Sequence, residues 1–76
     1  MINYYKKNQM HLSVDTDTQK IIVLMNEPND CSMRVTAPAS FYNKIAEDLT
    51  NNIIEESTEE AFNAARQEVE TRLLSL

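Results

Sequence analysis

The residues best suited to chemistry are one cysteine and one histidine. Cys31 is the single thiol and His11 the single imidazole among the 76 residues. Cysteine catalysis needs the two side chains within hydrogen-bonding distance, so that the imidazole can take the thiol proton. The alternation of apolar and polar residues predicts that His11 points outward and that Cys31 points into the core. We therefore interpret Cys31 as a small buried residue and His11 as an exposed strand residue, and we expect no enzymatic activity.

Asp15 and Asp17 have the spacing of the first ligands in a calcium-binding loop. That loop requires glycine at its sixth position and a bidentate glutamate at its twelfth. Lys20 and Asn26 occupy those positions here. The lone cysteine also has no metal-ligand spacing around it. We interpret residues 15–18 as a hairpin turn, and we expect no metal and no cofactor.

Residues 4–7 combine two tyrosines with two lysines, a pattern that could stack on and neutralise single-stranded nucleic acid. The net charge of −5 opposes such binding, and lysines at the end of a strand also serve to protect an exposed sheet edge. The chain has no glycine, which excludes glycine-rich phosphate-binding loops and leaves turns with positive φ to Asn or Asp. We expect no direct binding of nucleic acid.

Negative charge is concentrated in the second half of the chain. Residues 1–38 hold four basic and four acidic side chains, whereas residues 39–76 hold three basic and eight acidic ones, a balance of 3 − 8 = −5. Four glutamates flank the Ser-Thr pair at 57–58: Glu55, Glu56, Glu59 and Glu60. The first two are expected at the C-terminal end of a helix, where the helix dipole disfavours each by ~0.3–1 kcal/mol. We predict that these four residues bind a protein with a basic surface; the alternative is a merely solvated surface.

The two halves of the chain have different hydrophobic periods. Alternation predicts strands at residues 10–15 and 31–37, and the β-branched apolar run at 20–25 predicts a central strand that is apolar on both faces. Turns are expected at 15–18 and 26–30, while residues 2–5 either begin another strand or extend the first. The second half has two apolar stripes of helical spacing whose mean directions differ by roughly half a turn. We favour two helices, broken near Glu56-Ser57, over one long helix. Pro38 suits the first turn of the first helix, and Ser57 and Glu60 have capping-box spacing before the second.

These elements predict one α+β domain over residues 1–76. Residues 1–37 form a three-stranded antiparallel β-meander, and residues 38–76 form two α-helices that pack on one of its faces. The predicted core consists of Met10, Leu12, Val14, Ile22, Leu24, Met33, Val35, Ile45, Leu49, Ile53, Phe62 and Val69. So small a core often gains stability from oligomerisation. With the apolar C-terminal residues 73–76, this makes a self-associating assembly subunit, such as a homodimer, the alternative function.

The chain has no segment suited to a membrane or to secretion. Its longest apolar run, residues 21–25, is far shorter than the ~20 residues that cross a bilayer. No secretory signal is visible, and the single cysteine favours a reducing cytoplasmic setting.

In size, acidity and order of elements, the chain resembles small phage-encoded inhibitors of bacterial defence nucleases, including anti-CRISPR proteins. The resemblance implies an acidic surface that competes with nucleic acid for a basic groove in the host cytoplasm. We therefore expect a small, non-enzymatic, acidic protein-binding module.

Overall fold

The computed structural model describes residues 1–36 and 39–75, and the side chains of residues 1–35 and 43–75. The elements in chain order are β1 (Ile2–Lys7), β2 (Met10–Asp15), β3 (Ile21–Glu27), β4 (Asp30–Thr36), α1 (Ala39–Thr50), β5 (Glu55–Glu56) and α2 (Glu59–Leu74). The predicted α+β class and the two separate helices are confirmed. Pro38 lies outside the described residues. None of the described helices is long and apolar enough to span a bilayer.

The sheet is larger than the predicted three-stranded meander. Its five strands lie in the order β4-β3-β2-β1-β5, and each pair is antiparallel. Residues 2–7 form their own strand because a two-residue turn, with Asn8 at φ 53°, reverses the chain between Lys7 and Met10. β5 then adds two residues beside β1. Asn52 also has positive φ, as expected for asparagine, but so does Gln19, at φ 58°.

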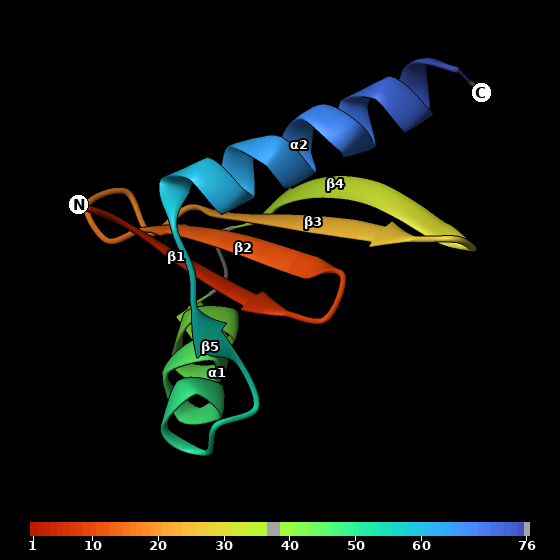
Figure 1. Cartoon of the computed structure of the whole chain (residues 1–76). Coiled ribbons are helices and arrows are strands. Elements are labelled where there is room, and N and C mark those ends of the chain that lie inside the picture. The colour runs from red at the N-terminus through yellow and green to blue at the C-terminus, as the bar shows by residue number, and fades with distance from the viewer. Residues whose placement is uncertain (37–38, 76) are drawn as a thin grey trace.

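The two helices pack on opposite faces of the sheet, so the prediction that they share one face is wrong (Figure 1). On the α1 face, Ile45 joins Leu12, Val14, Ile21, Val23 and Ile54 in one buried cluster. On the α2 face, Phe62, Ala65 and Val69 pack with Leu24 in another. The physical reason is that β3 is apolar on both sides, since Ile21 and Val23 alternate with Ile22 and Leu24. Each apolar face of such a strand must be buried against another element of secondary structure.

The helix α2 crosses the strands from β1 to β4. At its beginning, the backbone N–H of Ser57 donates to the Tyr4 carbonyl at 2.8 Å, and the Phe62 ring lies 5.4 Å from the Tyr4 ring. Near its end, the Cys31 thiol donates to the Val69 carbonyl at 3.7 Å. The chain therefore passes from β4 along one face as α1, pairs with β1 as β5, and returns along the other face as α2 (Figure 1).

Three residues of the predicted core are exposed, and Met10, Ile22 and Leu49 are half-buried. Ile53 is 45% exposed, because the chain has left α1 at Thr50 and the buried position passes to Ile54, at 5%. Met33 and Val35 on β4 are 36% and 65% exposed. Val35 is in the same row of the sheet as Ile22, whereas α2 reaches β4 nearer Cys31 and leaves the Val35 end uncovered.

Candidate functional site

The four predicted binding residues line one side of the molecule, at β5 and the beginning of α2. Glu55 and Glu56 belong to β5 rather than to the end of a helix, so the predicted conflict with the helix dipole is wrong. Glu55 pairs with Lys6 and Glu56 with Tyr5 in the β1–β5 register. Successive strand residues point to opposite faces, so these two carboxylates lie on different sides of the sheet.

Glu59 and Glu60 occupy the first turn of α2, where the helix dipole favours negative charge. The helix is capped by Thr58, whose hydroxyl accepts from the N–H of Ala61 at 3.1 Å. The predicted capping box is therefore wrong by one residue, because the backbone of Ser57 is held by β1 instead. Carboxylates at these two positions stabilise the helix and still reach solvent.

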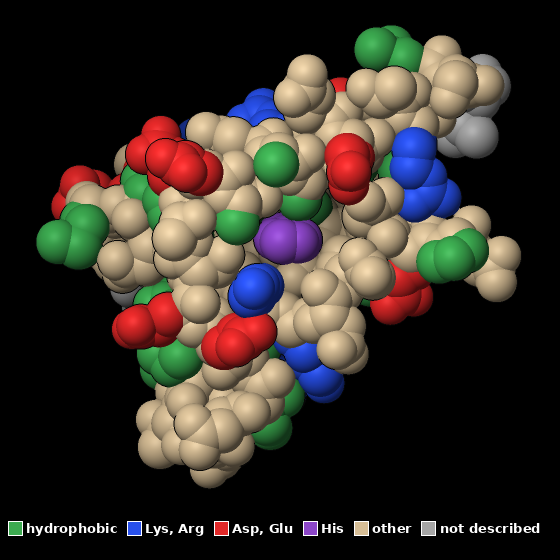
Figure 2. All heavy atoms as spheres, viewed as in Figure 1, with side chains coloured by type: hydrophobic (Ala, Val, Ile, Leu, Met, Phe, Trp, Pro, Cys, Tyr) green, Lys and Arg blue, Asp and Glu red, His purple; other side chains and the backbone are tan. Residues whose placement is uncertain are grey.

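We call Glu55, Glu56, Glu59 and Glu60 the acidic edge. All four are exposed, and acidic side chains appear along this side of the molecule in Figure 2. Lys6 Nζ lies 3.9 Å from Glu55 Oε1, which is a long ion pair whose carboxylate side chain is still 70% exposed. The structure thus brings four carboxylates to one side, arranged along an edge and split between two faces.

His11 and Cys31 lie on the same face of the sheet, contrary to the prediction that they point to opposite sides. His11 pairs with Leu24, and Cys31 pairs with Asn26 on the other side of β3, so β3 separates them. Both side chains lie on the α2 face, which is a second packed face rather than an open surface. The Cys31 thiol donates to the Val69 carbonyl, not to the imidazole.

The imidazole of His11 is half-buried, and Figure 2 shows it near the centre of the viewed face. Burial lowers its pKa, and the nearby Lys6 lowers it further, against a smaller opposing effect of Glu68. Its Nδ1 atom is buried and has no hydrogen-bond partner among the described residues. These conditions favour the neutral form of the imidazole, and among the described residues no thiol or hydroxyl is hydrogen-bonded to it.

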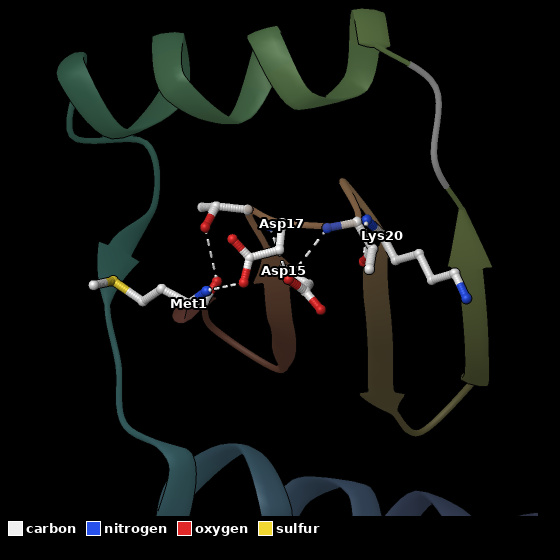
Figure 3. A network of polar contacts seen from close by, with 6 residues as sticks. Met1, Asp15, Asp17 and Lys20 are labelled. Carbon is white, nitrogen blue, oxygen red and sulfur yellow. Dashed lines mark hydrogen bonds and ion pairs between the residues drawn. The ribbon is translucent and has the colours of Figure 1, made fainter.

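Asp15 and Asp17 form a hairpin turn, as predicted (Figure 3). One oxygen of Asp15 accepts from the backbone N–H groups of Asp17 at 2.9 Å and Thr18 at 3.4 Å, and the hydrogen bond from Asp17 is the main cause of its lowered pKa. Asp17 pairs with the terminal ammonium of Met1 at 2.7 Å. Both carboxylates are therefore engaged by the chain itself, and the described residues contain no group of three metal-ligating side chains.

Tyr5 and Lys6 do not lie at an exposed strand edge, because β1 lies between β2 and β5 and pairs with β5 at these two residues. Tyr4 packs against Phe62 on the α2 face. Tyr5 packs with the cluster on the α1 face. The two tyrosines therefore serve two different cores and do not provide a joint stacking surface.

A polar cluster that the sequence pattern does not reveal joins α2 to the β3–β4 turn. Arg72 Nη1 donates to Asn26 Oδ1 at 2.6 Å, and Asn26 Nδ2 donates to Glu68 Oε2 at 2.9 Å. With Gln67 and Thr71, these residues line a shallow depression of about 510 Å³. Glu68 and Arg72 have the i, i+4 spacing that favours an ion pair along a helix, but both bind Asn26 instead. No local pattern could reveal contacts across 42 and 46 residues.

Comparison with known proteins gives no match to a family model, to a curated protein or to a solved structure.

Proposed function

We propose that this protein is a small, non-enzymatic binding module whose acidic edge docks on a protein with a basic surface. The observation that supports this is the exposure of four carboxylates on one side of the molecule, of which Glu55 alone has a cation nearby, Lys6 at 3.9 Å, in the described part of the chain. An excess of one charge on one surface steers an oppositely charged partner and accelerates association.

The arrangement along an edge favours a groove over a flat partner surface. Glu55 and Glu56 point to different faces, so basic residues on both walls of a groove could pair with them while the edge lies between the walls. A nucleic-acid-binding groove has this charge and shape. In its most specific form, suggested by the resemblance to phage-encoded inhibitors, the protein acts in the host cytoplasm and occupies the groove of a defence nuclease in place of nucleic acid.

The test compares two triple variants with the same net charge. The edge variant carries Glu56→Gln, Glu59→Gln and Glu60→Gln; the control carries Glu27→Gln, Glu47→Gln and Glu70→Gln, three exposed glutamates outside the acidic edge. Each is used, beside the parent, to capture proteins from bacterial lysate at low salt and at ~0.5 M salt, where exposed charges are screened.

A partner of the acidic edge is captured by the parent and by the control but not by the edge variant, and it is lost at high salt. Titration of the purified partner is then expected to show affinity at least ~10-fold weaker for the edge variant, chiefly through slower association. An oligonucleotide bound by that partner should be displaced by the parent. If the two triple variants bind equally, the acidic edge is only a solvated surface and the proposal is wrong.

A further inference from the structure

The outer strand β4 leaves one side of its backbone without a partner strand among the described residues. β4 is at the end of the strand order and pairs with β3 alone, over seven consecutive residues from Asp30 to Thr36. The two-residue turn makes Glu27 and Asp30 a hydrogen-bonded pair, so alternate residues after Asp30 bond to β3. It follows that the N–H and C=O groups of Cys31, Met33 and Val35 point away from the sheet.

This edge carries two charged side chains, Asp30 and Arg34, but lacks the other usual protection against pairing. Proteins protect edge strands with prolines, lysines, bulges or very short strands. The β3–β4 register is continuous, so β4 has no bulge, and its sequence DCSMRVT contains no proline and no lysine. The opposite end of the sheet, by contrast, is the two-residue β5.

The side chains beside this edge are apolar and exposed. Met33 and Val35 are 36% and 65% exposed on the α2 face. The last turn of α2 lies toward the other end of β4, because Leu73 packs against the same cluster as Cys31, and the neighbouring Leu74 is 87% exposed. Exposed apolar side chains of β4 thus adjoin its outward-pointing backbone groups.

We infer that β4 pairs with β4 of a second copy of this chain, antiparallel about a two-fold axis at Ser32. This register places Arg34 opposite the partner's Asp30 and, by symmetry, Asp30 opposite the partner's Arg34. Both side chains are exposed on the same face of the strand, and the described part of the chain offers Arg34 no ion pair. On the other face, Cys31 lies opposite the partner's Met33. Opposite charges placed directly across two strands stabilise the pair.

The neighbouring registers are less favourable. A two-fold axis at Arg34 would place the two guanidinium groups opposite each other, which is repulsive, and one at Met33 would place Arg34 opposite a serine. Only the axis at Ser32 places both charged residues of β4, Asp30 and Arg34, opposite a residue of opposite charge. The pairing joins two sheets into one of ten strands and leaves the acidic edge, at the other end of each sheet, free. The inference is therefore independent of the proposed function.

Charge reversal tests the interface and its register together. Asp30→Arg gives a chain with two basic residues at the paired positions, and Arg34→Asp gives one with two acidic residues. Each single variant repels its own copy, whereas a mixture of the two is complementary, and the double variant Asp30→Arg/Arg34→Asp restores the pairing with the charges exchanged. Sedimentation velocity gives the mass of each, and circular dichroism melting verifies that each variant is folded.

We expect the parent, at ~100 μM, to have twice the 8.8 kDa mass of one chain. Each single variant should be monomeric or dissociate at concentrations at least ~10-fold higher, and the equimolar mixture and the double variant should be dimeric again. A monomeric parent at this concentration overturns the inference. So do single variants that dimerise as the parent does, while folded single variants that fail to associate when mixed overturn the register.

Discussion

The adjacent residues Ile53 and Ile54 show the extent to which a hydrophobic pattern can predict whether a single residue is buried. The spacing of Ile45, Leu49 and Ile53 suggests a helical stripe, but a stripe predicts burial only while the chain remains helical. α1 ends at Thr50, and the backbone at Asn52 adopts positive φ. The turn and bend that follow direct Ile54 into the cluster with Leu12 and Ile45 and leave Ile53 toward solvent.

This difference predicts opposite outcomes for one kind of substitution. Ile54→Ala should lower the free energy of unfolding by about 2–4 kcal/mol, because it removes buried methylene groups and leaves a cavity. Ile53→Ala, at a position 45% exposed, should cost less than about 1 kcal/mol. Urea unfolding of the two variants beside the parent measures both values. Equal losses, or a larger loss at Ile53, would contradict the described path of residues 51–54.

His11 predicts a pH dependence of stability. Its folded-state pKa is lowered, mainly by burial and then by Lys6, from an unfolded value of ~6.5. Below that value the unfolded state binds the proton more readily than the folded state, so stability falls as the pH drops through the unfolded pKa and toward the folded one. Above it, both states are neutral and this contribution is constant.

Urea unfolding at pH 7.5 and 5.5 should therefore show lower stability at pH 5.5 in the parent and a smaller difference in His11→Gln. NMR titration of the imidazole gives the folded pKa directly. Asp15 also has a lowered pKa, but as a carboxyl group its contribution is lost only below about pH 4, outside this window. An imidazole pKa at or above the unfolded value would contradict the described burial.

At the scale of elements, the beginning of α2 is set by a contact between distant segments. The spacing of Ser57 and Glu60 fits a capping box, yet Thr58 is the cap. The N–H of Ser57 bonds to Tyr4 across the sheet, which holds Ser57 as a continuation of β5 and moves the start of the helix by one residue. A capping pattern in the local sequence cannot predict the effect of a hydrogen bond to a distant strand.

Thr58→Ala should destabilise the protein by about 1 kcal/mol, since the N–H of Ala61 loses its acceptor. The matched change Ser57→Ala should have a smaller effect, because Ser57 contributes its backbone N–H to the hydrogen bond with Tyr4 and alanine retains that group. Thermal unfolding of both variants provides the comparison. A larger effect at Ser57 would restore the capping box that the sequence suggested.

The strands β2, β3 and β4 were predictable because their apolar patterns are local and the turns between them carry their own signals, such as Asp15 and Pro28. The packing of the helices on two opposite faces was not predicted. Its physical reason is nevertheless visible in the sequence of β3, which is apolar on both faces at Ile21, Ile22, Val23 and Leu24. The charge excess at residues 55–60 was likewise visible in the sequence. Its arrangement along an edge was not, because it depends on β5, a two-residue strand defined by its pairing with β1.

At the scale of the whole molecule, the route of the chain determines which parts should open most easily. Neighbouring strands β1 to β4 are joined by turns of two to five residues, whereas α2 is held by contacts such as Asn26–Glu68, 42 residues apart. We expect amide hydrogens of α2 and β5 to exchange through a partial opening of lower free energy than that of β2 and β3. Hydrogen exchange under native conditions measures this order, and equal protection of α2 and β3 would contradict it.

The same route has a consequence for how the chain is made. The strands β1 to β4 need only local contacts and can form early, but the β1 edge is closed by residues 55–56, which follow α1 in the sequence and are made later. Until then the nascent chain exposes two strand edges and an uncovered apolar face, the state in which chains associate wrongly. Retention of residues 55–76 in the ribosome exit tunnel would prolong that state, so slow translation of the codons for these residues should favour aggregation.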